Sequence, residues 1–111
     1  MDIRVDSHDD GDGRHVVTVA GAVDIASRAV LLDDARAALA TPGTKQLVLD
    51  LEQVNFMDSS GIGALIELGG DAQDAGIDFA LRRPSARVRR VLQVTGLLDS
   101  WTIESGGDDE S

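Results

Sequence analysis

Hydrophobic and polar residues alternate near the start of the chain with the period of two that predicts β-strands. We predict one strand over Met1–Val5 and a second over His15–Ala20, the β-branched stretch HVVTVA. Between them, the stretch DSHDDGDG is rich in turn-forming residues, so the two strands should pair as an antiparallel hairpin.

After Asp24 the spacing of apolar residues becomes that of an amphipathic helix. Ser27 can cap its start, and Pro42-Gly43 ends it. One face of this helix collects Leu31, Ala35, Ala38 and Leu39. The next stretch, Lys45–Leu51 or KQLVLDL, alternates as a short strand.

A second helix is predicted from Ser60 to about Ala75. Its apolar stripe consists of Ile62, Leu65, Ile66 and Gly69. A glycine inside a helix costs about 1 kcal/mol relative to alanine. The adjacent pair Gly69-Gly70 therefore either permits close packing against the sheet or breaks the helix.

The remaining chain repeats the order of strand and helix. Ile77–Arg82 alternates as a strand, and a third helix should start with Pro84 in its first position and end at Gly96. Its apolar face consists of Val88, Val91, Leu92 and Thr95. The stretch LLDSWTIE then predicts a last strand or a short helix.

This element order indicates an α/β fold with a mainly parallel sheet, because helices alternate with strands after the first hairpin. A chain of 111 residues is sized for one core, so we expect one domain over residues 1–104. The polar residues 105–111 have nothing to bury and should form a disordered acidic tail.

Charge narrows the classes of partner. Twenty acidic and ten basic residues give a net charge of −10, which opposes binding to nucleic acid and to anionic membranes. A protein partner is therefore expected. Half of the basic residues cluster as Arg82, Arg83, Arg87, Arg89 and Arg90. We interpret this arginine cluster as the solvated face of the third helix.

The sequence also bears on location. There is no cysteine, no secretory-type amino terminus and no apolar run near the roughly 20 residues that span a bilayer. A cytoplasmic protein is the simplest expectation.

The sequence contains no convincing motif for catalysis or for metal binding. The stretch MDSSGIG lacks the first glycine of a Gly-x-Ser-x-Gly elbow, and the only histidines, His8 and His15, lie in or beside the first turn. The glycines after Ser60 lack the lysine of a phosphate-binding loop. The first turn weakly matches a calcium loop, but Val17 stands where a glutamate is needed. We expect no catalytic residue, no cofactor and no metal site.

The segment Asp58-Ser59-Ser60 is the candidate functional site, because it directly precedes the second helix. Serine is a preferred capping residue, and on physical grounds alone capping is the simpler role for both hydroxyls. The same place also suits a phosphate, because the positive end of a helix stabilises anions. Such a phosphate would act on a docking partner rather than on folding.

Three segments together resemble the STAS (sulfate transporter and anti-sigma factor antagonist) family, in particular its bacterial anti-sigma factor antagonists. The segments are LVLDLEQVNFMDSSGIGALIEL from Leu47 to Leu68, VVTVAGAVDIAS from Val16 to Ser27, and VRRVLQVTGLLDSWTI from Val88 to Ile103. The resemblance implies a mixed sheet of four or five strands with helices packed mainly on one side.

The resemblance also implies the site. By its motif the phosphorylated residue is Ser59, and Asp24, Asp58, Ser60 and Gly61 belong with Ser59 to the partner-binding surface. The implied partners are an anti-sigma factor that is itself an ATP-binding serine kinase, which phosphorylation releases, and a phosphatase acting on phospho-Ser59. This chain would not itself be an enzyme.

Two features leave alternatives open. Many relatives carry an acidic residue where this chain has Ala22, which puts the identity of the partner in doubt. A STAS domain can also serve as a non-catalytic subunit of a stress-signalling scaffold or a lipid-transport complex, although the absence of a further amino-terminal domain favours the antagonist. A nucleotide-binding module is the third alternative, and it lacks a phosphate-cradling motif.

Overall fold

The computed structural model describes residues 2–104, and these residues form a five-stranded sheet with three helices. The strands are β1 Ile3–Asp9, β2 Arg14–Val23, β3 Gln46–Met57, β4 Asp78–Arg82 and β5 Thr102–Glu104. Their order in the sheet is the same as their order in the chain. β1 pairs with β2 in antiparallel fashion, and the other three pairings are parallel. The predicted α/β fold and hairpin are confirmed, whereas the predicted tail over 105–111 lies outside the described residues.

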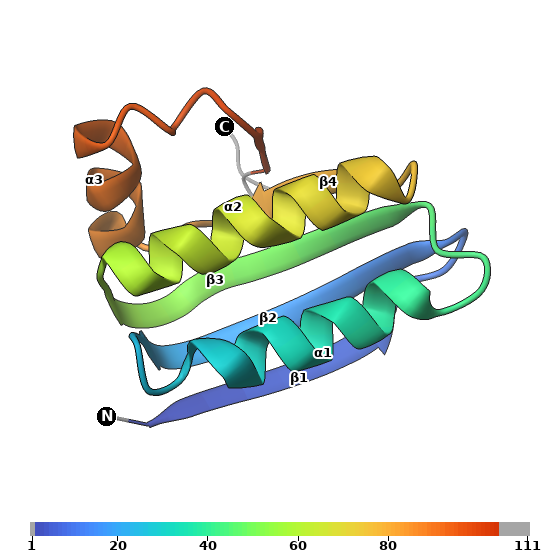
Figure 1. Cartoon of the computed structure of the whole chain (residues 1–111), viewed down its shortest axis with the longest axis horizontal. Coiled ribbons are helices and arrows are strands. Elements are labelled where there is room, and N and C mark those ends of the chain that lie inside the picture. The colour runs from blue at the N-terminus through green and yellow to red at the C-terminus, as the bar shows by residue number, and fades with distance from the viewer. Residues whose placement is uncertain (1, 105–111) are drawn as a thin grey trace.

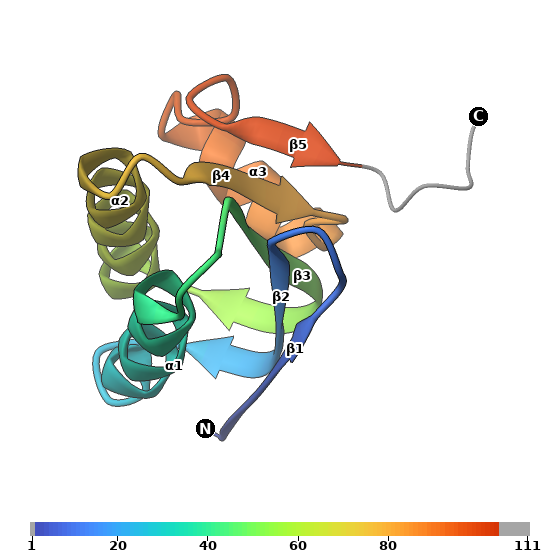
Figure 2. The ribbon, with the colours of Figure 1, turned by 90° about the vertical axis from the view of Figure 1, so that its right-hand side faces the viewer.

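The helices are α1 Arg28–Ala40, α2 Ser59–Asp74 and α3 Ala86–Val94. α1 and α2 lie side by side over one face of the sheet (Figure 1), and the view along the sheet shows that face covered by the two helices (Figure 2). α3 packs against β3 near the start of α2 (Figure 1). Because each crossover helix returns the chain to the same end of the sheet, the loops before α1 and α2 emerge together.

The central strands are buried on both faces, as is usual for parallel strands. Val17, Leu49 and Leu81 face the helices and belong to the main core. The alternate residues Val16, Val48 and Ala80 form a small buried cluster on the opposite face. These three residues are aligned by the registers of the strands. This double burial explains the nearly continuous apolar run of β3.

The strands are longer than the sequence pattern predicts. β1 continues to Asp9, which places Asp6 and His8 of the weak calcium-loop match in a strand rather than in a turn. β2 continues past Ala20 because Gly21 adopts φ +98° and lies opposite Ile3. A side chain at Gly21 would come within 2.2 Å of the carbonyl oxygen of Asp2, so the glycine permits this pairing.

β3 also exceeds its predicted end at Leu51 and runs to Met57. Its second half carries the exposed residues Glu52, Gln53 and Asn55, which hide the strand in the sequence pattern. Two register shifts against β2 accommodate the extra residues, one between Thr18 and Ala20 and one between Gly21 and Ala22. Such bulges bend a strand and change the direction of its side chains.

α2 confirms the second predicted helix, but the predicted stripe is wrong at Ile66, which is half-exposed. The buried face is instead Gly61, Ile62, Ala64, Leu65, Leu68 and Ala72. This face is rotated from the predicted stripe because α2 packs against both the sheet and α1. The helix continues through Gly69-Gly70, and a Cβ at Gly69 would lie 2.8 Å from Nε1 of Trp101 and 3.6 Å from the Phe79 ring of β4.

The start of α3 differs from its prediction. Pro84 precedes the helix, and the N-cap is Ser85, whose hydroxyl accepts a hydrogen bond from the backbone N–H of Val88. Gly96 ends the helix with φ +76° as expected. The last element is a three-residue strand, β5, which pairs with β4.

Candidate functional site

The starts of α1 and α2 lie next to each other at the carboxyl ends of β2 and β3. The strands end in register, with Val23 opposite Met57. The backbone N–H of Asp58 also donates to the carbonyl of Val23 at 3.4 Å. The loop that carries Asp24 and the segment that carries Ser59 therefore begin side by side, although 35 positions separate the two residues in the sequence numbering.

The start of α2 is capped by its aspartate. Asp58 is the N-cap, and its Oδ1 accepts hydrogen bonds from the backbone N–H groups of Ser60 at 2.9 Å and Gly61 at 3.3 Å. A carboxylate at this position also interacts favourably with the positive end of the helix. The capping role that the sequence left open for the serines thus belongs to Asp58.

Ser59 is the first residue of α2, and its side chain is exposed. Within residues 2–104 its hydroxyl has no hydrogen-bond partner. Ser60 is half-buried, and its carbonyl accepts a hydrogen bond from Nε of Arg28 at 3.2 Å. Neither side-chain hydroxyl has a hydrogen-bond partner within residues 2–104, and of the two serines Ser59 is the more exposed.

In the loop before α1, the polar side chains form hydrogen bonds within the loop itself. Oδ1 of Asp24 accepts from the backbone N–H groups of Ala26 at 3.1 Å and Ser27 at 3.0 Å. The Ser27 hydroxyl is buried, accepts from the backbone N–H of Asp24, and has both Oδ1 of Asp24 and the Ala22 carbonyl within hydrogen-bond distance. The Ser27 side chain, with help from the loop N–H groups, holds the pKa of Asp24 below its ordinary value.

Ser27 stands at the N-cap of α1 as predicted, but its side chain makes no capping hydrogen bond to the helix. It braces the loop instead. This difference could not be read from the sequence, because it depends on the Ala22 carbonyl being within 2.8 Å of the Ser27 hydroxyl.

Gly61 is where the start of α2 comes closest to the end of β2. A Cβ at this position would lie 2.8 Å from the Val23 carbonyl oxygen and 2.6 Å from Cγ of Met57. Both distances are shorter than normal contacts, so only glycine fits here. Gly63 differs, because a Cβ there would have nothing within 4 Å. Gly61 therefore has a packing role that fixes the position of the Asp58-Ser59 segment.

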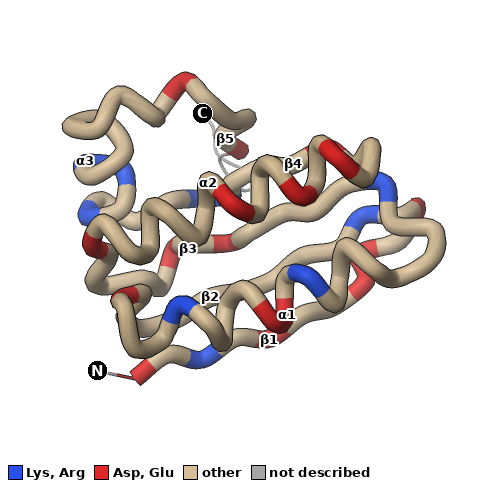
Figure 3. The backbone as a smooth tube through the Cα atoms, in the orientation of Figure 1, with Lys and Arg blue, Asp and Glu red and all other residues tan. Residues whose placement is uncertain are grey.

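Arg28 joins the starts of the two helices, and the sequence interpretation missed it. Besides its bond to the Ser60 carbonyl, its guanidinium pairs with Glu67 of α2. Arg36 of α1 continues the link to Glu67 at 3.1 Å and to Asp71 at 2.8 Å. Figure 3 shows basic positions along α1 next to acidic positions along the neighbouring α2. The only sequence signal was the spacing of four residues between Glu67 and Asp71 on one helix face.

The ion pairs with Arg28, and secondarily with Arg36, lower the pKa of Glu67. The pKa of Arg36 is raised, chiefly by Asp71. These groups are largely exposed, so each pair contributes modestly to stability. They connect α1 with α2 along the sides of the helices that carry Arg28, Arg36, Glu67 and Asp71.

The predicted partner-binding residues are thus brought together. Asp24, Asp58, Ser59, Ser60 and Gly61 all lie at the adjacent starts of α1 and α2, and we call this surface the docking face. Two exposed apolar residues flank it: Ile25, next to Asp24, and Ile66, which follows Ser59 by two turns on α2. An exposed hydroxyl between apolar and acidic groups suits protein recognition and covalent modification.

The arginine cluster divides into two parts. Arg82 pairs with Glu104 at 3.6 Å, and Arg83 pairs with the buried Asp50 at 2.6 Å. Arg87, Arg89 and Arg90 are exposed and have no ion-pair partner in the part of the chain that the structure describes. Basic residues gather on α3 (Figure 3).

Among residues 2–104 no group of three or more His, Asp or Glu side chains could hold a metal ion. Over the same residues, no helix is long and apolar enough to cross a membrane.

Comparison with known proteins gives a consistent result. A family model described as the STAS domain matches residues 5–109. The anti-sigma-B factor antagonist of Staphylococcus aureus is 28% identical over 68 residues, which are 61% of this chain and 63% of that protein. The match therefore spans less than two thirds of the length of the curated relative.

Solved structures are similar over nearly the whole chain. An anti-sigma factor antagonist from Mycobacterium paratuberculosis superposes with a TM-score of 0.79 and 28% identity, covering 97% of this chain and 90% of that one. The unphosphorylated anti-sigma factor antagonist SpoIIAA superposes with a TM-score of 0.78 and 21% identity, covering 95% and 90% of the two chains. The phosphorylated form of SpoIIAA, from Bacillus, gives a TM-score of 0.73 at 20% identity, covering 95% and 94%. The SpoIIAA comparisons speak for the fold alone.

Proposed function

The chain belongs to the STAS-domain family, and on this premise we propose that it is an anti-sigma factor antagonist switched off by phosphorylation of Ser59. STAS proteins of this type are regulatory and non-catalytic, and this chain is not an enzyme. Its activity is to bind an anti-sigma factor and thereby release a sigma factor for transcription. The relatives named above as antagonists support this general role.

One observation carries the choice of Ser59. Its hydroxyl is exposed and unbonded within residues 2–104, because the adjacent Asp58 has taken over the capping of α2. Ser60 is half-buried and its carbonyl accepts a hydrogen bond from Arg28, and Ser27 is buried with its hydroxyl already hydrogen-bonded. Ser59 is thus the serine of the docking face that a kinase can reach without opening the fold. SpoIIAA, which shares this fold, has been solved in a phosphorylated form, so the fold itself is compatible with phosphorylation.

The phosphate would act on the partner rather than on the fold. It adds about −1.5 to −2 charge units at the positive end of α2, a position that tolerates anions. On the partner side it adds bulk and negative charge beside Asp58 and Asp24. A partner surface that packs closely on Ile25, Ser59 and Ile66 would lose contact and gain repulsion. Binding should therefore weaken while the protein stays folded.

We propose that the partner is an ATP-binding anti-sigma factor with serine kinase activity and that a phosphatase restores Ser59. The protein should be incubated with ATP and the candidate kinase, and the phosphopeptide located by mass spectrometry. Phosphate is expected on Ser59, none on the S59A variant, and an unchanged level on S60A, the matched control. Equal phosphorylation of S59A and the unmodified protein would rule out the assigned site.

Binding provides the second test. In a calorimetric titration with the same anti-sigma factor, Ser59→Asp should bind at least about tenfold more weakly, a loss of about 1.4 kcal/mol. Ser59→Ala should bind as the unmodified protein does, since it adds neither charge nor bulk to the surface. Unchanged affinity of Ser59→Asp and of the phosphorylated protein would contradict the switch while leaving the antagonist role standing.

A further inference from the structure

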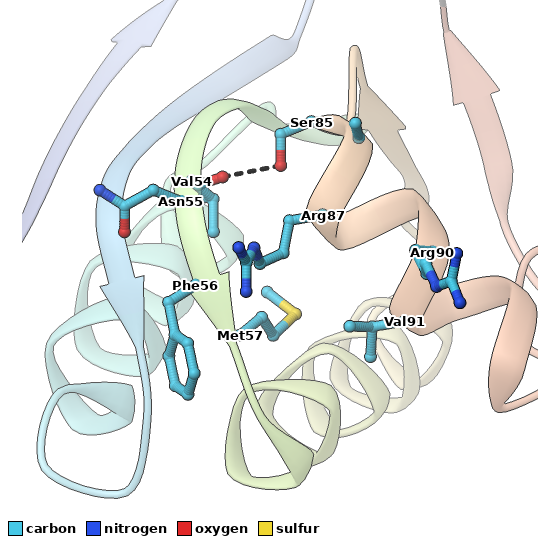
Figure 4. Close-up of a pocket in the computed structure, with 9 residues that line it drawn as sticks. Val54, Asn55, Phe56, Met57, Ser85, Arg87, Arg90 and Val91 are labelled. Carbon is cyan, nitrogen blue, oxygen red and sulfur yellow. Dashed lines mark hydrogen bonds between the residues drawn. The ribbon is translucent and has the colours of Figure 1, made fainter.

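A groove outside the docking face lies between the end of β3 and the start of α3. It has a volume of about 760 Å³, and its apolar walls include Phe56 and Met57 of β3 and Val91 of α3 (Figure 4). The groove exists because β4 pairs with β3 only as far as Asp50. Beyond that point α3, rather than a strand, lies alongside β3, held by the Ser85 hydroxyl donating to the Val54 carbonyl at 2.7 Å.

The charge of this groove is opposite to that of the protein. Arg87 and Arg90 line it, and none of its lining residues is acidic. Figure 4 shows Arg87 reaching across the groove toward Met57, with Arg90 at the α3 side. Neither arginine has an ion-pair partner within residues 2–104, on a chain whose net charge is −10. Two unpaired guanidinium groups beside an apolar wall are complementary to an acidic ligand with apolar side chains.

The groove adjoins the docking face through Met57. The side chain of Met57 lines the groove, and its Cγ lies 2.6 Å from the place that a Cβ on Gly61 would occupy. The next residue is Asp58. A polypeptide that covers the docking face can therefore continue into the groove without a gap between the two surfaces.

We propose that this groove binds an acidic segment of a protein partner, with apolar side chains packed on Phe56, Met57 and Val91 and carboxylates paired with Arg87 and Arg90. This contact is separate from Ser59 and does not depend on its phosphorylation. It gives Arg87 and Arg90 a role in recognition rather than in solvation alone.

The structure favours a peptide over a nucleotide in this place. The backbone N–H of Ser85 already donates to the Leu51 carbonyl, and that of Val88 donates to the Ser85 hydroxyl. These two amides are therefore already engaged, and the apolar wall of Phe56, Met57 and Val91 suits apolar side chains better than a phosphate. Nucleic acid and anionic membranes are disfavoured by the net charge of −10.

The test uses the unmodified full chain as bait for a phage-displayed library of random dodecapeptides. Selected peptides are synthesised, their affinity is measured by fluorescence anisotropy, and their site is mapped by amide chemical shifts in NMR. The enriched peptides should combine aspartate or glutamate with apolar residues, and the shifts should centre on Phe56, Met57 and Val91.

Three variants sharpen the result. Arg87→Glu with Arg90→Glu should weaken peptide binding by about tenfold or more, because two attractive pairs become repulsive. Arg89→Glu is the matched control, since Arg89 is exposed on the same helix but does not line the groove, and it should change affinity less than about twofold. Val91→Ser should also weaken binding, through loss of apolar contact.

The proposal is overturned if the selection yields no acidic consensus, or if the shifts map elsewhere. Equal losses in the Arg89 variant and the double variant would overturn it as well, because they would indicate unspecific attraction between charges. A peptide displaced by ATP or GTP at comparable concentration would assign the groove to a nucleotide instead.

Discussion

The starts of α1 and α2 carry the same residue types, but the serine is buried and hydrogen-bonded at α1 and exposed at α2. Each pairs an aspartate with a serine directly after a parallel strand, and the two lie side by side. At α1, Asp24 and Ser27 bond to each other and to their own loop, and Ser27 is buried. At α2, Asp58 accepts from the amides of Ser60 and Gly61 and Ser59 stays exposed. The comparison shows why Ser59 rather than Ser27 is a candidate for modification: the neighbouring Asp58 caps the helix, so the Ser59 hydroxyl has no structural role.

The largest expected loss of stability comes from a substitution that forces the start of α2 away from β2. Gly61→Ala would place a Cβ 2.8 Å from the Val23 carbonyl oxygen, and overpacking of this kind costs about 1–3 kcal/mol. Gly63→Ala is the matched control: it has open space, and we expect it to stabilise the helix by about 1 kcal/mol. Urea unfolding of both variants measures the difference, and equal effects of the two substitutions would contradict the close contact.

The second effect is the difference in stability between alanine variants of Ser27 and Ser59. Ser27→Ala removes a buried hydroxyl that serves the backbone N–H of Asp24 and the Ala22 carbonyl, which should cost about 1–3 kcal/mol of unfolding free energy. Ser59→Ala should change stability by less than about 0.5 kcal/mol, since the residue is exposed. Thermal unfolding followed by circular dichroism compares them. If Ser59→Ala proved the more destabilising, Ser59 would be a structural residue.

The third effect tests which residue caps α2. Asp58→Ala should destabilise the protein by about 1 kcal/mol, the usual cost of losing an N-cap. Asp58→Asn keeps an acceptor oxygen at the cap and should lose less. The same unfolding measurement decides, and an Ala variant as stable as the Asn variant would mean that the cap contributes nothing.

The smallest effect concerns pH. The pKa of Asp24 is lowered in the folded protein, chiefly by the Ser27 hydroxyl, so its contribution to stability is present above its ordinary pKa. That contribution is lost as the pH falls through the lowered value. In Ser27→Ala the pKa of Asp24 should move up toward its ordinary value, which a carboxyl NMR titration measures. An unmoved titration curve would show that Ser27 is not the cause.

The fold was predictable from the sequence to a large extent, because periodicity reports which side of an element is buried. The hairpin, the three helices and the alternation that demands parallel strands all follow from local pattern. The second half of β3 was missed because Glu52, Gln53 and Asn55 interrupt the pattern while the backbone still pairs with β2. That pairing is a tertiary contact, and periodicity within one segment does not contain it.

The site was predicted in part. Pattern located the Asp58-Ser59-Ser60 segment at a helix start, but three successive residues could each cap a helix. The length of β3 decides among them, because the strand ends at Met57 and leaves Asp58 at the N-cap. The adjacency of Asp24 and the bridge made by Arg28 join positions far apart in the chain, so only the folded structure supplies them. The choice of Ser59 over Ser60 came from family resemblance, and its phosphorylation stays a prediction.

The strand order of the sheet has a consequence for how the protein is made. Strands β1 to β5 stand in the sheet in the order of their synthesis. Each strand therefore pairs with the one that left the ribosome just before it, and no pairing waits for a later segment. Loops that close early in this way cost little entropy and expose unpaired edges only briefly. We expect the sheet to grow in one direction during translation, with the docking face complete once α2 has emerged and before α3 and β5 are made.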